Sequence, residues 1–164
     1  MSAVSLVSIT ASDGRLEAIV RVTGPLRTSA YPGLSDRALS ALPTLAAHTC
    51  DNADGRTPAD ELADTELPHA LEHVALDLLH RAGVRGTLRG ETTWDFERDG
   101  TGVFRVVLDG ADAMPAEAAI ESAARFMGWL TGDVARPEVA GQVARVRRAR
   151  TAVRPEPQPR PRRQ

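Results

Sequence analysis

The sequence has few of the residues that build sulfur-rich or membrane-embedded structures. One cysteine among 164 residues excludes a disulfide framework, a four-cysteine zinc site and an iron–sulfur cluster. No apolar run approaches the roughly 18 residues of a membrane span, so we expect no membrane partner. Residues 1–10 carry no basic residue ahead of their apolar side chains, which argues against a secretory signal and favours a cytoplasmic protein.

Aromatic residues are also scarce. They make up 4% of the chain, whereas hydrophobic residues make up 42%, so the core must be built from alanine, valine and leucine. The length fits a single domain of ordinary size.

Charge is divided unevenly along the chain. Residues 1–135 hold 11 Arg against 20 Asp and Glu, a net charge of −9, and residues 136–164 hold 9 Arg against 2 Glu, a net charge of +7. The second stretch also contains five prolines. We predict a short helix over residues 138–150 and a disordered Arg/Pro-rich tail for the rest of 136–164. No aromatic residues interrupt the arginines, so we interpret the tail as a solubilising or linker segment and do not expect nucleic-acid binding.

Alternating apolar residues predict strands in two pairs. Residues 4–9 and 16–22 flank the turn residues that end in Gly14 and form a first hairpin. Residues 87–96 and 102–108 form a second hairpin through a polar loop.

Helical spacing predicts three helices, in segments separate from the strands. The first covers residues 35–46 with a break at Pro43, the second covers 67–81, and the third begins near Pro115 and ends before Gly132. Residues 51–60 are predicted as a polar loop. Blocks of strands and helices without strict alternation favour an α+β domain over residues 1–135, in which an antiparallel sheet of hairpins carries the helices on one face.

An H-x-x-E-H motif occupies the second predicted helix and consists of His69, Glu72 and His73. The i, i+4 spacing places both imidazoles on one helical face, about 5–6 Å apart at Cβ, which suits a single metal ion. Glu72 lies close to that face and can accept a proton from water that zinc activates. The pattern is a zinc-peptidase signature, although buried, hydrogen-bonded helix histidines produce it as well.

A catalytic zinc takes three protein ligands and keeps one open position, so a third ligand is needed. The strand that follows the helix must run back along it, because the connecting residues 82–84 are few. Leu71, at the centre of the motif, lies about 15 Å from the helix end at 1.5 Å per residue, a distance that a strand covers in about four to five residues. This geometry favours Glu91 as third ligand and leaves Asp109 as the alternative. Glu91 is equally compatible with a solvated strand carboxylate.

The remaining histidines receive other interpretations. His80 lies seven residues after His73, about 10 Å along the helix, and is too far away to bind the same ion. His48 and Cys50 form a short pair for which nucleophilic catalysis is conceivable. Without a third orienting group, packing is the better interpretation of this cysteine, since free cysteines are commonly buried. The guanidinium of Arg89 suits an oxyanion or a substrate carboxylate.

Several segments, in this order, resemble the N-terminal domain of cyanophycin synthetase and together cover about residues 31–130. They are Tyr31-Pro32-Gly33-Leu34, Leu42-Pro43-Thr44-Leu45, His48-Thr49-Cys50, Leu71-Glu72-His73-Val74-Ala75-Leu76-Asp77-Leu78, Ala82-Gly83, Arg89-Gly90-Glu91-Thr92 and Gly102-Val103-Phe104-Arg105-Val106-Val107. The resemblance implies an α+β domain. In some members this domain is similar to a zinc metallopeptidase and cuts cyanophycin, a polymer of aspartate with arginine on its side chains. In others it holds the polymer while ATP-using domains extend it.

The resemblance also implies that His69 and His73 are ligands and that Glu72 is the catalytic carboxylate. The sequence departs from the family's usual opening over residues 4–22, and Asp109 stands where the family tends to have a Glu-rich strand end. The ATP-grasp and Mur-ligase-like domains of the synthetase do not fit in 164 residues. We therefore expect a stand-alone domain that does not synthesise the polymer, and a separate ligase is a candidate partner.

Two functions follow from these observations. The first is a zinc-dependent hydrolase of amide or isopeptide bonds in a peptide or a cyanophycin-like polymer. Its candidate catalytic residues are Glu72 and Arg89, and its candidate Zn²⁺ ligands are His69, His73 and Glu91. The alternative is a non-catalytic accessory module that binds the polymer or a partner enzyme and keeps the motif as a packing element.

Overall fold

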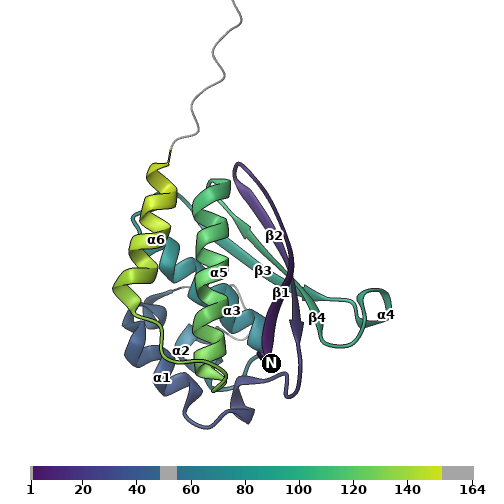
Figure 1. The fold of residues 1–164 in the computed structure, drawn as a ribbon. Coiled ribbons are helices and arrows are strands. Elements are labelled where there is room, and N and C mark those ends of the chain that lie inside the picture. The colour runs from purple at the N-terminus through teal and green to yellow at the C-terminus, as the bar shows by residue number, and fades with distance from the viewer. Residues whose placement is uncertain (1, 49–54, 153–164) are drawn as a thin grey trace, which may run out of the picture.

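The protein folds as an α+β domain, as the arrangement of its strands and helices predicts (Figure 1). The computed structural model describes residues 2–48 and 55–152. The strands are β1 (Val4–Ser12), β2 (Arg15–Val22), β3 (Arg89–Trp94) and β4 (Val103–Asp109). The helices are α1 (Leu34–Ala41), α2 (Pro58–Ala63), α3 (Leu67–Arg81), α4 (Phe96–Asp99), α5 (Ala113–Leu130) and α6 (Val139–Thr151), with short 3₁₀ segments η1 (Thr28–Ala30) and η2 (Pro43–Ala47).

The strands form one antiparallel sheet in the order β1-β2-β4-β3. Both predicted hairpins are confirmed, and the pairing of β2 with β4 joins them into a continuous sheet. The connection between β3 and β4 contains the short helix α4 where the sequence predicts only a polar loop, because the side chain of Asp95 accepts a hydrogen bond from the backbone N–H of Arg98 and starts a helical turn.

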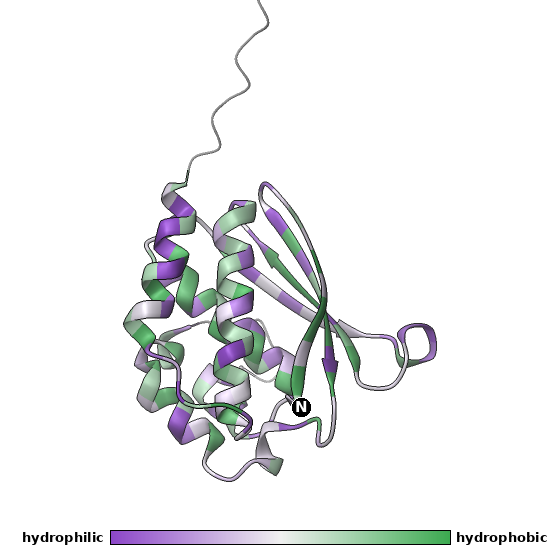
Figure 2. Ribbon diagram, viewed as in Figure 1, coloured by the Kyte–Doolittle hydropathy of each residue, from purple (hydrophilic) through white to green (hydrophobic). Residues whose placement is uncertain are grey.

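The core lies between one face of the sheet and the helices α3 and α5. Leu16, Ala18 and Val20 of β2 are fully buried at every second position, as expected for a strand with one covered face. The two long helices pack against each other and against the sheet. Their buried residues are mostly apolar, and hydrophobic residues recur along both helices (Figure 2). Apart from Phe104 and Phe126, the large, fully buried side chains are leucines, which agrees with the scarcity of aromatic residues.

Helix α3 has the predicted bounds, whereas the bounds of the other helices differ from the predicted ones. Helix α1 ends before Pro43, where the chain continues as η2, so the expected break is present. Helix α2 lies partly within residues 51–60, which the sequence predicts as a loop. Within the described residues, no helix is both long and apolar enough to cross a membrane.

The helix predicted over residues 138–150 is present as α6 and packs against α5 and α3 (Figure 1). Val146 is fully buried, and Arg145 bonds to Glu121 and to Ser122 of α5. Arg150 donates to the carbonyl of Gly83, just beyond the end of α3. The folded unit therefore continues past the predicted boundary at residue 135. The tail predicted beyond residue 152 lies outside the described residues.

Candidate metal centre and active site

The first half of α3 carries the H-x-x-E-H motif into the interior of the protein. The helix begins with Leu67 and Pro68, where proline suits the first turn. Because the next residues are helical without interruption, His69, Glu72 and His73 follow on adjoining faces. His73 and Glu72 are only 3% and 4% exposed, whereas His69 is partly exposed. The motif therefore lies where the helix meets the rest of the domain.

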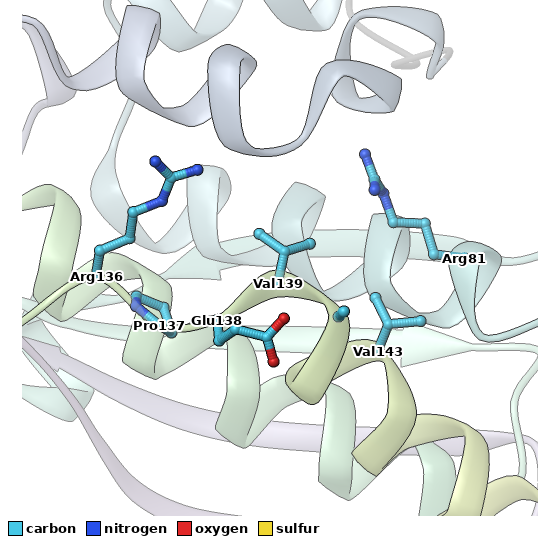
Figure 3. A pocket seen from close by; sticks show the side chains of 7 residues that line it. Arg81, Arg136, Pro137, Glu138, Val139 and Val143 are labelled. Carbon is cyan, nitrogen blue, oxygen red and sulfur yellow. The ribbon is translucent and has the colours of Figure 1, made fainter.

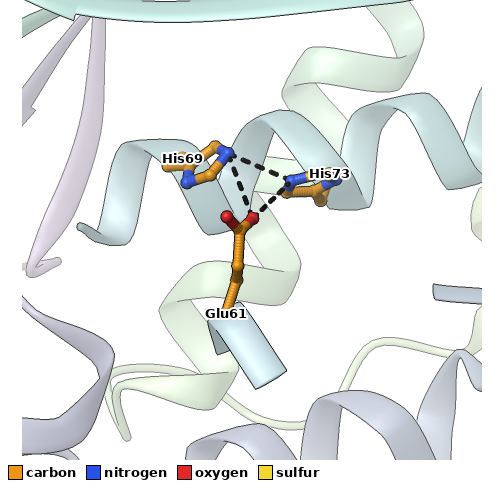
Figure 4. A group of neighbouring side chains, drawn as sticks. All are labelled: Glu61, His69 and His73. Atoms are coloured by element: carbon orange, nitrogen blue, oxygen red, sulfur yellow. Dashed lines mark hydrogen bonds and ion pairs between the residues drawn. The ribbon is translucent and has the colours of Figure 1, made fainter. Parts of the chain in front are cut away.

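Three ligand atoms converge at this point: Nε2 of His69, Nε2 of His73 and Oε2 of Glu61 (Figure 4). The two Nε2 atoms are 3.1 Å apart. Oε2 of Glu61 is 3.8 Å from Nε2 of His69 and 3.7 Å from Nε2 of His73. The structure thus brings the two predicted histidines together, and the carboxylate that joins them is Glu61 from α2.

The position of Glu61 depends on how α2 begins. Thr57 and Asp60 form a reciprocal capping box, in which the Thr57 side chain accepts from the backbone N–H of Asp60 at 3.2 Å. Pro58 occupies the first helical position. This start places Glu61 in the first turn of the helix. The Thr-x-x-Asp pattern with its proline is visible in the sequence and is the signal that could have revealed α2 and this carboxylate.

The cluster fits a zinc ion in donor type and in spacing. Imidazole nitrogen and carboxylate oxygen are common zinc ligands, and bonds of about 2.0–2.1 Å at tetrahedral angles place two ligand atoms about 3.3 Å apart. The three observed separations, 3.1, 3.7 and 3.8 Å, bracket that distance. Two histidines and one carboxylate would leave a fourth position for water or substrate, as in catalytic zinc sites.

Neighbouring groups keep the histidines in a form that can bind a metal. The hydroxyl of Thr65 donates to Glu66 at 3.4 Å and shares a hydrogen bond of 2.8 Å with Nδ1 of His69, so Nε2 is the ring nitrogen of His69 that faces the cluster. Burial, together with the nearby His69 and His48, lowers the pKa of His73 to about 3. His73 is therefore neutral near pH 7, the state that metal coordination requires.

Glu72 lies on the side of α3 that contacts strand β3. Its Oε2 accepts a hydrogen bond of 2.6 Å from the hydroxyl of Thr92. Gly90 allows the strand to lie directly against this side chain, since a Cβ there would be 2.6 Å from Cγ of Glu72. Burial raises the pKa of Glu72, and the carboxylates of Glu61 and Glu91 add to this effect, although Thr92 and His69 oppose it. A raised pKa suits a carboxylate that must accept and return a proton near neutral pH.

A cavity of about 650 Å³ opens beside these groups, between α3 and β3. His69, Glu72 and His73 line one side of it, and residues 87–92 line the other. Arg89, predicted as a catalytic residue, begins β3 and lines this cavity. The prediction that the strand returns to the motif near residues 89–91 agrees with the contact between Gly90 and Glu72.

The two carboxylates proposed from sequence as third ligand do not join the histidine cluster. Glu91 lines the cavity, but Gly90 and Thr92 are the β3 residues directed at α3, and side chains alternate along a strand. Asp109, at the end of β4, forms an ion pair with Arg15 at 2.9 Å. Within the part of the chain that the structure describes, Glu61 is the carboxylate grouped with His69 and His73.

The other histidines lie next to the site, in a row along α3. The ring centroid of His48 is 6.5 Å from that of His73 and 6.5 Å from that of His80. Nε2 of His48 bonds to the fully buried Asp77 at 2.9 Å. His80 does not belong to the ligand cluster, in agreement with the prediction. Cys50 lies outside the described residues.

Asp77 joins α3 to η2. Its carboxylate accepts hydrogen bonds from Thr44 and from Arg81 as well as contacting His48. Burial alone would raise the pKa of Asp77, but the hydrogen bonds with His48 and Thr44 and the charge of Arg81 outweigh it and hold the pKa below its usual range. The network fixes the chain segment that leads from α1 toward α2 against the helix that carries the motif.

A second hollow, of about 810 Å³, lies between the end of α3 and the start of α6 (Figure 3). Its polar side chains have structural partners. Arg81 binds Asp77, Arg136 lies over the ring of Trp129, and Glu138 caps α6 by accepting from the backbone N–H of Gly141. The side chains suited to metal binding and proton transfer are therefore concentrated at the cavity between α3 and β3.

A family model for the cyanophycin synthase-like N-terminal domain matches residues 16–131, which is more than half of the chain. The chain belongs to this family. The match includes the whole of the site, from Glu61 to Asp109, and confirms the resemblance seen in the sequence motifs. Strand β1 and helix α6 lie outside the matched region. The comparison with curated proteins found no match.

Proposed function

We propose that the protein is a zinc-dependent hydrolase of amide or isopeptide bonds. The observation that carries the proposal is the convergence of two imidazole nitrogens and one carboxylate oxygen, 3.1–3.8 Å apart, directly beside the buried Glu72. His69, His73 and Glu61 would hold the ion. When bound there, Zn²⁺ supplies Lewis-acid activation of water and of an amide carbonyl.

The protein's own residues supply the proton transfer and the binding. Glu72 accepts a proton from the attacking water and returns it to the leaving nitrogen, and its burial makes it a stronger base for the first step by raising its pKa. Thr92 holds Oε2 of Glu72 in place through its hydroxyl. Arg89 lines the cavity from the same face of β3 as Glu91, which alternation directs away from α3, so its guanidinium would bind a substrate carboxylate at the cavity mouth rather than an oxyanion beside Glu72.

The cavity and the family together suggest the substrate class. Glu66, Glu91 and Asp109 line the cavity beside the single guanidinium of Arg89. A rim rich in carboxylates attracts cationic groups such as the arginine side chain, whereas Arg89 attracts a carboxylate. A cyanophycin-like polymer of aspartate and arginine offers both. We therefore propose such a polymer, made by a separate ligase, as the substrate.

The proposal is tested by metal content and turnover on the full chain. We expect about one zinc per protein and release of short fragments from a polymer of aspartate with arginine on its side chains. The variant Glu72→Gln retains zinc and loses turnover by about 10²–10⁴-fold, the usual contribution of a general base. The matched control is Glu97→Gln, an exposed position in α4, which leaves turnover unchanged.

Two results would overturn the hydrolase. One is the lack of stoichiometric zinc, with His69→Ala and His73→Ala folding as well as the wild type. The other is full activity of Glu72→Gln. Polymer binding without zinc would instead support the accessory module, in which the contacts among Glu61, His69 and His73 serve only to pack α2 against α3.

A further inference from the structure

Strand β3 is an edge of the sheet, and its outer side is open. It pairs with β4 on one side, and within the described residues no strand pairs with its other side. Every second residue of an edge strand directs its backbone N–H and C=O away from the sheet, where they can pair with another chain. The outer side of β3 therefore offers a row of main-chain donors and acceptors.

The two edges of the sheet differ in how well they could accept another strand. The register of β1 shifts between Leu6 and Ser8, a bulge of the kind that disrupts edge pairing. The register of β3 is continuous from Arg89 to Trp94, with no shift and no proline. At about 3.3 Å per residue, its six residues present roughly 20 Å of regular edge.

The open edge of β3 borders the catalytic cavity. Thr92 and Gly90, from the middle of the strand, contact Glu72, and the strand lines the cavity from Arg89 to Thr92. Trp94 ends the strand, is 52% exposed, and also lines the cavity. Its ring packs against the ring of Phe104, with the centroids 5.8 Å apart. A supported and exposed indole offers a ligand a firm apolar surface.

We propose that β3 binds the main chain of the substrate as an added antiparallel or parallel strand. The occupant is an extended polypeptide main chain, because the edge offers amide groups at the strand repeat over several residues and not a single pocket. Side chains of the bound strand alternate, so every second one faces α3 and the cavity. This pairing would hold a scissile bond beside Glu72. The strand pairing depends on the proposed function for one point only, the bond that the site hydrolyses.

Hydrogen exchange measured by NMR tests this pairing. The protein is the zinc-loaded full chain carrying Glu72→Gln, so that the probe is not consumed. The probe is a short oligomer of aspartate residues, each carrying arginine on its side-chain carboxyl. We expect amide exchange in residues 89–94 to slow by about tenfold at every second residue only, because the alternate amides already pair with β4.

A second measurement tests the same hydrogen bonds from the probe's side. Main-chain N-methylation of the probe at the residues that donate to β3 weakens binding by about 2–12-fold for each bond removed. Methylation at the intervening residues, the matched control, has a smaller effect. Equal losses at both sets of positions would overturn the pairing.

The outcomes separate this proposal from the hydrolase itself. Probe binding with no protection in β3, or failure of the probe to bind, overturns the added strand. Hydrolysis by the wild type without protection of β3 overturns the added strand and leaves the hydrolase standing. If amide exchange slows at every second residue of β3 but the wild type shows no turnover, the added strand is supported and the hydrolase is overturned.

Discussion

Replacing Gly90 by alanine is the sharpest test of how the site is built. Gly90 does not have a positive φ, so alanine introduces no backbone strain there. The new Cβ would instead lie 2.5 Å from Cδ of Glu72 and closer still to its Oε1, whereas ordinary van der Waals contact begins at 3.4 Å. Either the Glu72 side chain or strand β3 must move by at least about 0.9 Å, the difference between these two distances.

The size of the effect follows from this overlap. Overpacking of a closely packed site costs about 1–3 kcal/mol, which lowers Tm by about 2–12 °C for a chain of this length. A misplacement of about 1 Å at a reacting group can reduce the rate by about 10²-fold. Zinc content should not change, because the three atoms nearest to the new methyl group all belong to Glu72, which is not one of the three ligand residues.

Three measurements on Gly90→Ala check these values: thermal unfolding, zinc stoichiometry and kcat/KM on the aspartate–arginine polymer. Gly141→Ala is the matched control. Its Cβ would lie 2.7 Å from Oε2 of Glu138, which is the end of a flexible side chain and can move aside at the cost of the helix-cap hydrogen bond to Gly141. We expect Gly141→Ala to keep the zinc content and the kcat/KM of the wild type, because this cap lies at the start of α6 and not at the site. Unchanged kcat/KM in Gly90→Ala would refute the conclusion that the contact between β3 and Glu72 positions the base.

The remaining predictions concern the groups around the site. Asp77→Ala should cost about 1.5–3 kcal/mol in urea unfolding at pH 7, because it removes a fully buried carboxylate that accepts hydrogen bonds from Thr44 and Arg81. The folded-state pKa of Asp77 is lowered, so the stabilisation that its charged form provides is present at neutral pH and is lost as the pH falls through that pKa. The difference in the free energy of unfolding between the wild type and Asp77→Asn should therefore become smaller in acid. Thr65→Val removes the partner of His69 and should weaken zinc binding by about 10-fold or more in a competition titration; equal affinity would contradict the role given to Thr65. Val146→Asp buries a charge under α6 and should lower stability by about 3 kcal/mol, whereas a stable variant would show that α6 does not belong to the core.

The motif and its helix were predictable from the sequence because they depend on local spacing. Apolar residues at helical intervals, with Pro68 in the first turn, determine the bounds of α3, and the i, i+4 spacing alone places His69 and His73 on one face. The hairpins were predictable for the same reason, since alternation and turn residues act over a few neighbouring positions.

The partners of the motif were decided by the tertiary structure. Glu61 reaches the histidines because a six-residue helix, too short to show clear periodicity, packs beside α3. Strand β3 lies near the motif because the chain runs back along α3. The pleat of the strand then decides that Gly90 and Thr92 face Glu72 and that Glu91 does not. One residue of register exchanges the two faces of a strand, and a count of residues along the chain does not determine it. The sequence by itself therefore determined the ligand helix, whereas packing between distant segments decided which carboxylate completes the cluster and which residues hold the base.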